Sequence, residues 1–457
     1  MVELEPGRCA FKTGGTTGAS SIQIKEGVIG QIARGDFPRP RILTPSAPGK
    51  IAGDPTSEKL THHAQWAEEA LKAGNPDLFD WHTAVIAARF LGIVADLNLN
   101  PAKYERLLEQ YRGSLELHVG HEGLLEIIQG NIMADFIPNA EFVWPDELVA
   151  VDQYGRIMGE QTKAMTRTYL RNAKDEDKVL IVVPHNGRDK RGHMLELTRN
   201  CGDAVGANMA RAIKAPYVIF GSTDGIYSID PERYADVSPR KREKLTFKEL
   251  HTATQGGAYV VHIEGIVPIE EMEDGHLEVR HNVETDKQGT DVEHERDDMK
   301  TGQAPRLLAG DVGNRSLNFV RKGRLPEEYF EQLVTAVLRE MEIPAKRITT
   351  DAHGATAIID RSNGFTREER TKLRKDTGAE SVEIERGVGM ITIVGEDFVG
   401  SYEATGLIGK VLSDSKIKHD IFDTGRGSGK LVIVKKPEDF ERAMKNLHTE
   451  LIEGEAA

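Results

Sequence analysis

The stretch Lys12-Thr13-Gly14-Gly15-Thr16-Thr17 decides the fold and lies close to the beginning of the chain. Apolar Ala10 and Phe11 precede it and an amphipathic segment, residues 22–32, follows, so the order predicts a strand, a tight loop and a helix. Glycines let a backbone pass close to a ligand, a helix N-terminus favours an anion, and Lys12 supplies charge for a phosphate. A surface turn with a solvated lysine has the same residue types, and both interpretations stand at this point.

The composition of the chain bounds its class. It has 457 residues, of which 39% are hydrophobic and 29% charged, which is typical of a soluble protein with two or three domains. No apolar run approaches the roughly 20 residues of a membrane span, and the first residues lack the pattern of a signal peptide. The net charge of −14 argues against a nucleic-acid-binding surface.

Cysteine usage points to a reducing compartment. The chain has two cysteines, Cys9 and Cys201, which make neither a disulfide framework nor a zinc site. We therefore expect the protein in the cytoplasm.

Alternating strands and helices predict an α/β domain with a largely parallel sheet. Residues 39–45, 178–183 and 217–220 read as strands, and the second has a continuous apolar run that is typical of a sheet buried on both faces. Asp203 occupies the expected N-cap of a helix over residues 204–214. Ligands of such sheets bind beyond the carboxyl ends of the strands, where the loops after Phe11, Leu43 and Phe220 begin.

Two further segments complete this part of the chain. Residues 58–115 have helical periodicity, with Trp66, Phe90 and Ile93 as expected core residues that only pack. Residues 284–302 are polar and charged, which predicts exposed loop or edge structure before a domain boundary near residue 305.

The last 150 residues have a different pattern. Strands and helices follow one another there in the order βαββαβ and then βαββα, which predicts two small ferredoxin-like βαββαβ units suited to binding or scaffolding. The expected strands lie at residues 316–320, 347–350, 355–359, 381–385, 389–394, 419–422 and 431–434, and the expected helices at 326–341, 366–377, 405–412 and 438–451.

In order and spacing, the loop motifs resemble those of the aspartate kinase family. Residues 12–17 are similar to that family's Lys-Phe-Gly-Gly-Thr-Ser, residues 199–203 to its Arg-Gly-Gly-Ser-Asp, and Asp-Gly-Ile-Tyr at 224–227 to its Asp-Gly-Val-Tyr. The other matching motifs are residues 46–50, 59–61, 230–231, 245–250, 257–258, 261–262 and 289–290. The resemblance implies a three-layer amino-acid-kinase domain (residues 1–305), related to carbamate kinase in fold, followed by tandem ACT domains (residues 306–457).

The resemblance also implies roles for residues at the matching positions. Lys12 would bridge the transferring phosphate, with Asp203 orienting it or supporting Mg²⁺. ATP would lie against Gly14, Gly15, Ser222, Asp224, Tyr227 and Arg233. The amino acid would contact Thr16, Thr17, Ser46, Thr61, Asn131 and Arg199, the last as a clamp on the α-carboxylate. The purely structural alternatives are an N-cap for Asp203, a surface ion pair for Arg199 and a core position for Tyr227.

Several positions depart from the family pattern. The family's Gly-Glu, whose carboxylate faces the substrate ammonium, is aligned with Gly130-Asn131. The other departures are Gly202, Gly221, Ser222, Glu232 and Tyr259. Three functions therefore remain open: phosphorylation of aspartate by ATP, a paralogous kinase acting on another small amino or carboxylic acid, and a catalytically weak amino-acid sensor.

Other motifs receive no catalytic role. The glycine-rich residues 425–430 lack the first glycine and the Ser or Thr of a P-loop. Residues 118–122 have no partner with metal-ligand spacing, so no metal site is assigned. The histidines His62, His63, His185 and His262 read as structural or solvated, because an ionised carboxylate acceptor needs no general base.

The ACT pair implies an amino-acid effector, such as lysine or threonine, and a homodimer or a higher homo-oligomer. The turns Lys322-Gly323 and Val399-Gly400 precede the first helix of each unit, where free N–H groups would bind an effector carboxylate. A dimerisation module without an effector is the open alternative.

Overall fold

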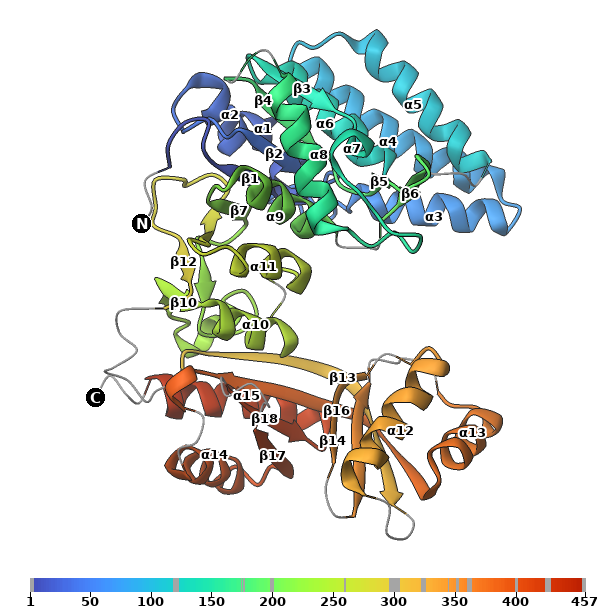
Figure 1. The fold of residues 1–457 in the computed structure, drawn as a ribbon, viewed down its shortest axis with the longest axis vertical. Helices are drawn as coiled ribbons and strands as arrows, with labels where there is room; N and C mark the ends of the chain where they lie inside the picture. Colours follow the sequence, from blue (N-terminus) through green and yellow to red (C-terminus); the bar gives the residue numbers. More distant parts are fainter. Residues whose placement is uncertain are drawn as a thin grey trace. The chain divides into compact units, whose positions relative to one another are not determined.

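The structure, a computed structural model, describes most of the chain. The described residues are 4–117, 123–173, 175, 177–197, 201–258, 260–295, 305–321, 326–343, 345–350, 353–359, 364–398, 402–423 and 429–453. They form two compact units, which Figure 1 colours from blue to red along the sequence. The first unit comprises Met1–Ile226, Lys241–Phe247 and Val260–Arg296, and the second comprises Tyr227–Arg240, Lys248–Tyr259 and Asp297–Ala457.

An eight-stranded sheet organises the first unit. Its strands stand in the order β10-β12-β11-β7-β1-β2-β4-β3, and every neighbouring pair is parallel except β11 with β12. The bounds are β1 Ala10–Thr13, β2 Ile42–Pro45, β3 Ala140–Val143, β4 Val179–Val182, β7 Tyr217–Gly221, β10 Lys244–Thr246, β11 Leu277–His281 and β12 Thr290–Glu293. The prediction of a mostly parallel sheet is confirmed.

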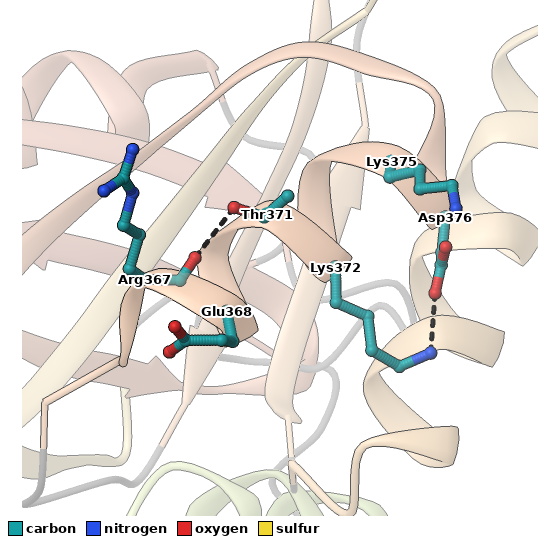
Figure 2. A pocket seen from close by; sticks show the side chains of 6 residues that line it. All are labelled: Arg367, Glu368, Thr371, Lys372, Lys375 and Asp376. Atoms are coloured by element: carbon teal, nitrogen blue, oxygen red, sulfur yellow. Dashed lines mark hydrogen bonds and ion pairs between the residues drawn. The ribbon is translucent and has the colours of Figure 1, made fainter.

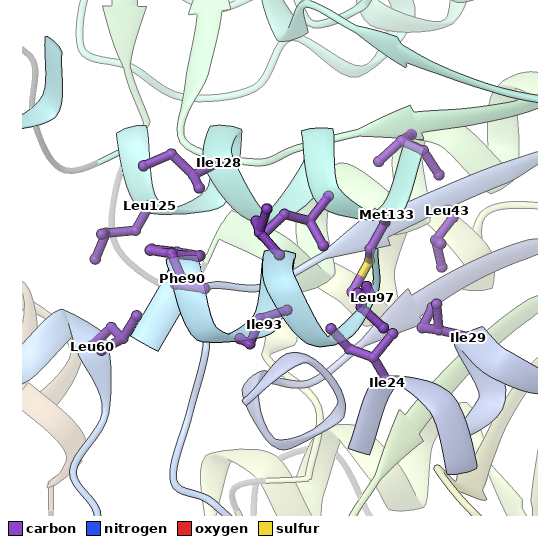
Figure 3. Packing of buried hydrophobic residues seen from close by; sticks show 14 of the residues in the cluster. Ile24, Ile29, Leu43, Leu60, Phe90, Ile93, Leu97, Leu125, Ile128 and Met133 are labelled. Atoms are coloured by element: carbon purple, nitrogen blue, oxygen red, sulfur yellow. The ribbon is translucent and has the colours of Figure 1, made fainter. Parts of the chain in front are cut away.

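Helices cover the sheet and complete an α/β layer structure. They are α1 Ser21–Glu26, α2 Val28–Arg34, α3 Leu60–Lys72, α4 Pro76–Asp96, α5 Pro101–Glu116, α6 Leu124–Phe136, α7 Pro145–Leu148, α8 Gly159–Asn172, α9 Cys201–Ile213 and α11 Ile263–Glu270. Short strands lie between them at β5 Asn186–Arg188, β6 Met194–Glu196 and β9 Lys241–Arg242. Phe11, Leu43 and Val218 point from one face of the sheet into a core shared with α1, α2 and α3 to α6. Figure 3 shows side chains of α4 and α6 packing in this core.

Three local expectations were wrong. Residues 22–32 are not one helix: Gly27 is extended, and a Cβ there would lie 2.5 Å from the Gln23 carbonyl oxygen. Asp203 is no N-cap, because α9 begins at Cys201 and places Asp203 in its first turn. Residues 284–302 are not only exposed loop, since β12 lies inside the sheet with Thr290 and Asp291 buried.

Among the residues that the structure describes, one helix, α4, is long and apolar enough to span a membrane by length and composition. Its residues Phe79, Ile86, Phe90 and Ile93 are buried in the core of the first unit. The helix therefore has a packing role in this fold. Trp66 of the neighbouring α3, expected in the core, is partly exposed.

A second sheet organises the second unit, in the order β14-β15-β13-β16-β18-β17, with antiparallel pairing throughout. The strands are β13 Leu307–Arg321, β14 Ala345–Thr350, β15 Gly354–Ile359, β16 Ala379–Val394, β17 His419–Asp423 and β18 Gly429–Val434. The helices are α10 Phe247–Gln255, α12 Glu327–Glu340, α13 Arg367–Thr377, α14 Tyr402–Asp414 and α15 Phe440–His448. The ferredoxin-like prediction is confirmed.

The two ferredoxin-like halves share their central strands. Residues 381–385 and 389–394, expected as two strands, are one strand, β16, which pairs with β13 along nearly its whole length. The first half of β13 pairs with the last residues of β16, and its second half with the first residues of β16. The early half of β13 thus serves as the last strand of the second ferredoxin-like half, which local sequence patterns do not reveal.

A buried histidine pair joins α3 to α4 in the first unit. Nδ1 of His63 lies 3.1 Å from Nδ1 of His82, so one imidazole donates to the other, and the rings pack against Trp66 and Trp81. Burial lowers the pKa of both imidazoles, and the pKa of His63 is lowered further by charge on His82. Two protonated rings would each place a hydrogen between the facing nitrogens, so the pair favours the neutral state.

This pair predicts an acid-sensitive stability. A depressed folded-state pKa contributes stability that is present above the unfolded value of about 6.5 and lost as the pH falls below it. We expect Tm to fall from pH 7.5 to pH 5.5, and to fall less in His82→Gln than in the wild-type chain. His193→Gln, which removes an exposed imidazole of the same unit, is the control. Identical pH profiles for His82→Gln and wild type, measured by calorimetry, would show that the pair does not couple to folding.

Candidate active site

The carboxyl ends of three neighbouring strands meet at one edge of the parallel sheet. Thr13, the last residue of β1, pairs with Pro45 at the end of β2 and with Phe220 near the end of β7. The loops that follow, residues 14–20, 46–59 and 222–225, therefore begin side by side. The expectation that these three loops share one edge is confirmed, and this edge is where α/β sheets bind ligands.

The first two loops interlock through glycines. The Gly49 amide donates to the Gly15 carbonyl at 2.8 Å, and a Cβ on Gly15 would lie 2.8 Å from the Ala47 carbonyl oxygen. The Gly14 amide donates to the Phe220 carbonyl at 3.1 Å, so it holds the loop to β7. The sequence predicted that both glycines face a ligand; in this structure the Gly14 N–H is engaged with protein, and Gly15 lies against the second loop.

Lys12 and Asp203 form the central ion pair of this edge. Nζ of Lys12 lies 2.8 Å from Oδ1 of Asp203, and the two side chains are 16% and 12% exposed. Oδ2 of Asp203 accepts from the His262 amide at 2.8 Å. The carboxylate is therefore held from two sides and fixes the ammonium group of Lys12 beside the glycine loop.

Close packing around Asp203 sets its position. A Cβ on Gly265 of α11 would lie 2.6 Å from the Cβ of Asp203, so α11 packs directly on α9. Tyr217, buried at the start of β7, donates its hydroxyl to the Asp203 carbonyl at 3.1 Å. Burial, and then the nearby Asp203 charge, raise the pKa of Tyr217 well above its usual value, so the phenol keeps its proton.

Gly202 brings the second loop into the same site. A Cβ at Gly202 would lie 3.7 Å from Cε of Lys12 and 3.8 Å from Oγ of Ser46. The absence of a side chain there leaves space next to the ammonium group. Lys12, Ser46 and Asp203 thus converge on a position beside the first turn of α9, whose N–H groups favour an anion.

Thr16 and Thr17 lie in the short 3₁₀ turn Gly15–Gly18. Thr17 is fully buried. The side-chain amide nitrogen of Asn282 lies 3.4 Å from the hydroxyl oxygens of both threonines. Their hydroxyls support the loop in this structure. Asn282, which sequence reasoning missed, is the residue that anchors this turn to the end of β11.

The third loop contains Ser222, which is exposed, and Asp224. Oδ2 of Asp224 lies 3.1 Å from Nζ of Lys241, which also donates to the Gln288 carbonyl at 2.8 Å. Lys241 was not among the predicted site residues, because it follows the motif by 14 positions and belongs to no recognised pattern. The ion pair therefore places the ammonium group of Lys241 next to the third loop.

Thr61 is the second residue of α3, the helix that follows the second loop. The Leu60 amide donates to the Pro48 carbonyl at 3.1 Å, which attaches α3 to the second loop. Arg89 of α4 donates to the carbonyls of Gly49 and Glu58, at 3.0 and 2.8 Å. Arg89 is therefore a positioning residue for this loop that the periodicity of α4 did not single out.

Asn131 lies within α6 and directs its amide to its own helix. Its Nδ2 donates to the Ile127 carbonyl at 2.9 Å, and Gly130 packs against Val183 and Phe142. The Asn131 side chain is thereby engaged in an intrahelical contact of the kind that polar residues make in helices.

Tyr227 and Arg233 belong to the second unit. Arg233 forms an ion pair with Glu441 of α15, and its guanidinium lies over the rings of Tyr234 and Phe440. These contacts engage Arg233 within its own unit.

Several predicted residues lie outside the described part of the chain. They are Arg199, Tyr259, residues 118–122, residues 425–428 of the glycine-rich stretch, and the turns Lys322-Gly323 and Val399-Gly400.

The two thiols of the first unit and the imidazole of His185 are held in protein contacts. Burial raises the pKa of the Cys9 and Cys201 thiols to about 12, so both remain protonated and inert. Nε2 of His185 lies 3.2 Å from Oε1 of the buried Glu126. The arrangement therefore offers positioning and positive charge, with Lys12 as its central group.

The second unit has a shallow pocket of about 560 Å³ on α13 (Figure 2). Thr371 donates to the Arg367 carbonyl at 2.8 Å, and Lys372 pairs with Asp376 at 2.6 Å. A single helix provides the lining, which contains none of the predicted site residues.

The interlocked glycines predict a stability loss in Gly15→Ala. Its Cβ would meet backbone atoms of Ala47 and Gly49 at 2.8 and 3.0 Å, and backbone atoms cannot rotate away. We expect destabilisation of about 1–3 kcal/mol, seen as a lower Tm. Gly92→Ala in α4 is the matched control, because its Cβ would meet nothing within 4 Å and alanine favours a helix. An unchanged Tm for Gly15→Ala would refute the close contact of the two loops.

The chain was compared with known proteins by sequence and by structure. No protein-family model matches the chain. The aspartate kinase of Pseudomonas putida is 32% identical over 92 residues, which are 20% of this chain and 22% of that protein. The aspartokinase of Pseudomonas aeruginosa is 29% identical over 100 residues, 22% of this chain and 24% of that protein. The chain thus matches less than a quarter of the length of these curated relatives.

Two solved structures match nearly the full chain. The aspartate kinase of Clostridium acetobutylicum has a TM-score of 0.73 and 21% identity, covering 97% of this chain and 99% of that one. Aspartokinase III of E. coli, in complex with aspartate and ADP, has a TM-score of 0.79 and 19% identity with the same coverage. The chain therefore has the fold of the aspartate kinases over nearly its whole length and shares a stretch of related sequence with them.

Proposed function

We propose that the chain is an aspartate kinase, which transfers the γ-phosphoryl group of ATP to the side-chain carboxylate of aspartate. The observation that carries the proposal is the Lys12–Asp203 ion pair beside the glycine loop, at the edge where β1, β2 and β7 end. The fold of the aspartate kinases over the whole chain supports it. The product, 4-phospho-aspartate, would enter biosynthesis of the lysine, threonine and methionine type or of ectoine-like products.

The chemistry needs positioning and charge more than covalent participation. A carboxylate oxygen of aspartate attacks the γ-phosphorus, the bond to the β,γ-bridging oxygen breaks, and ADP leaves. The attacking carboxylate, with a reference pKa of about 3.9, is already ionised at neutral pH, so no base is required. Lys12 is poised to stabilise the charge that develops on the transferring group, and Asp203 holds its ammonium in place.

The remaining residues divide into those that would bind ATP and those that would bind the amino acid. Gly15 and the Ser222 and Asp224 loop would border ATP, whose Mg²⁺ neutralises the phosphates when bound. Ser46, Thr61 and Arg199 would hold the amino acid, with Arg199 binding its α-carboxylate. The free, buried cysteines fit a reducing cytoplasm.

A second acceptor remains open on one observation. Position 131 has an amide where the family has a carboxylate for the substrate ammonium, and the Asn131 amide donates to its own helix. A paralogous kinase that phosphorylates another small acid would use the same Lys12 site. It would differ from an aspartate kinase in the acid that stimulates ADP release from ATP.

We predict that Lys12→Ala lowers ATP-dependent acyl phosphate formation at least ~100-fold while the chain remains folded. Loss of one preorganised charge donor has about this effect on transition-state stabilisation. Turnover by an ADP-release assay and the thermal transition by calorimetry check the two parts. Lys178→Ala, which removes a lysine from the surface pair with Glu141, is the control and should keep full activity. Near-normal turnover in Lys12→Ala would remove this residue from the mechanism.

We further propose that residues 306–457 form tandem ACT domains that bind an amino-acid effector and contribute to a homo-oligomer. The shared sheet of β13 and β16 supports two ACT-like halves, and E. coli aspartokinase III has a solved complex with lysine and aspartate. An effector regulates only if it binds one global state better than another.

The full-length chain should therefore respond to an end-product amino acid in two ways. We expect at least one proteinogenic amino acid, with lysine and threonine tested first, to inhibit ADP release and to raise Tm. The D-enantiomer of the active compound is the control. If no proteinogenic amino acid changes either quantity, the second unit is a scaffold without an effector site.

A further inference from the structure

Four polar residues share one face of the β11–β12 strand pair. The antiparallel register sets Glu278 opposite Asp291 and Leu277 opposite Val292. Because side chains alternate along a strand, His276 and Glu278 point to the same side, opposite Glu293 and Asp291 respectively. The strand pattern alone therefore gathers an imidazole and three carboxylates.

This face is buried in the first unit. His276, Glu278 and Asp291 are 6%, 0% and 1% exposed. One potential ligand atom from each of the three lies within 4.8 Å of the other two. Such closeness of two carboxylates in a dry environment costs free energy unless positive charge compensates it.

The contacts within the cluster leave one carboxylate oxygen unsatisfied. Oε1 of Glu278 accepts from Nε of Arg280, which balances one negative charge. Oε2 of Glu278 is buried and has no hydrogen-bond partner among the described residues. A fully buried, unpartnered carboxylate oxygen is rare in folded proteins and requires an explanation such as an ion.

His276 is oriented as a metal ligand would be. Its Nε2 lies 3.5 Å from Oδ1 of Asp291, and its Nδ1 lies 3.4 Å from Oε1 of the half-exposed Glu293. A carboxylate near one ring nitrogen favours the proton on that nitrogen and leaves the other nitrogen for a metal. Two donors on a tetrahedral zinc ion lie roughly 3.3 Å apart for bonds of about 2.0 Å, close to the spacing of Nε2 and Oδ1.

We propose that His276, Glu278 and Asp291 bind a divalent transition metal ion of the Zn²⁺ class, with water as a fourth ligand and Glu293 as a positioning residue for His276. One imidazole and two carboxylates suit such an ion better than the all-oxygen shell that Ca²⁺ or Mg²⁺ prefers. The ion ties β11 to β12 and has a structural role.

The site is separate from the proposed nucleotide site. Leu277 pairs with Tyr217, the first residue of β7, whereas the Lys12 loops leave from the other end of that strand. The cluster therefore lies toward the amino-terminal edge of the parallel strands, and the ion is not the Mg²⁺ that accompanies ATP. The proposal does not depend on kinase activity.

Binding to the full-length chain tests the proposal directly. After treatment with a chelator and desalting, the protein is titrated with Zn²⁺ against a chromophoric competitor and, separately, with Co²⁺ as a spectroscopic probe. We expect one equivalent of metal per chain, a higher Tm with Zn²⁺, and visible Co²⁺ bands without the charge-transfer absorption of a thiolate.

Substitutions then locate the ion. Glu278→Gln and Asp291→Asn keep the side-chain shape and should weaken Zn²⁺ binding at least 100-fold, and Glu293→Gln about 10-fold. His193→Gln, at an exposed imidazole that lies 3.5 Å from Asp189, is the control and should bind as wild type.

Three results would overturn the proposal. The first is no stoichiometric binding by the wild-type chain, which would make the cluster an ion-pair network without a metal. The second is unchanged affinity in the substituted chains, and the third is thiolate bands that place the ion at Cys9 or Cys201. The wild-type titration decides the question even where a substituted chain fails to fold.

Discussion

The ion pair between Lys12 and Asp203 is the interaction on which the site depends. Both side chains are largely removed from water, so the pair is stable only because other groups hold it. The His262 amide, the close approach of Gly265 and the Tyr217 hydroxyl hold the Asp203 residue. Residues from β1, α9 and α11, separated by more than 200 positions in sequence, thus fix one ammonium group next to the glycine loop. Catalysis by charge stabilisation requires this kind of prior arrangement.

The parallel sheet also explains why polar groups collect at its two edges. At the carboxyl-terminal edge of β1, β2 and β7, glycines replace side chains and backbone groups come close together. Toward the opposite edge, the antiparallel addition of β12 to β11 brings His276 and Glu278 to face Asp291 and Glu293. Each arrangement removes carboxylates from water. One is compensated by a lysine, and the proposed metal ion compensates the other.

Much of the fold was predictable because its strongest local signals agree with the final structure. The apolar runs at β1, β2, β4 and β7, each followed by a polar loop, predicted the parallel sheet and the meeting of three loops. Lys12, Ser46 and Asp203, which the loop motifs singled out, lie close together at this edge.

The remainder depends on contacts distant in sequence. Asp203 resembled an N-cap because α9 begins before its apolar run, and only α11 shows that the carboxylate faces Lys12. Strand β12 has the sequence Thr-Asp-Val-Glu, and its polar residues resembled a loop. Only the pairing with β11 shows that this segment is a buried strand. The prediction divided β16 into two strands and found only residues 316–320 of β13, since glycines inside both strands resemble turns and the long pairing of the two strands is not visible locally.

Trapping of the acyl phosphate with hydroxylamine tests the central claim most directly. The full-length chain is incubated with Mg-ATP, hydroxylamine and each candidate acid, and the hydroxamate is identified by mass. The account predicts aspartate β-hydroxamate, formed in step with ADP. ADP release with a hydroxamate of a different acid would assign the chain to another acceptor. The absence of any hydroxamate with all the acids would contradict the claim that Lys12 and Asp203 form a phosphoryl-transfer site.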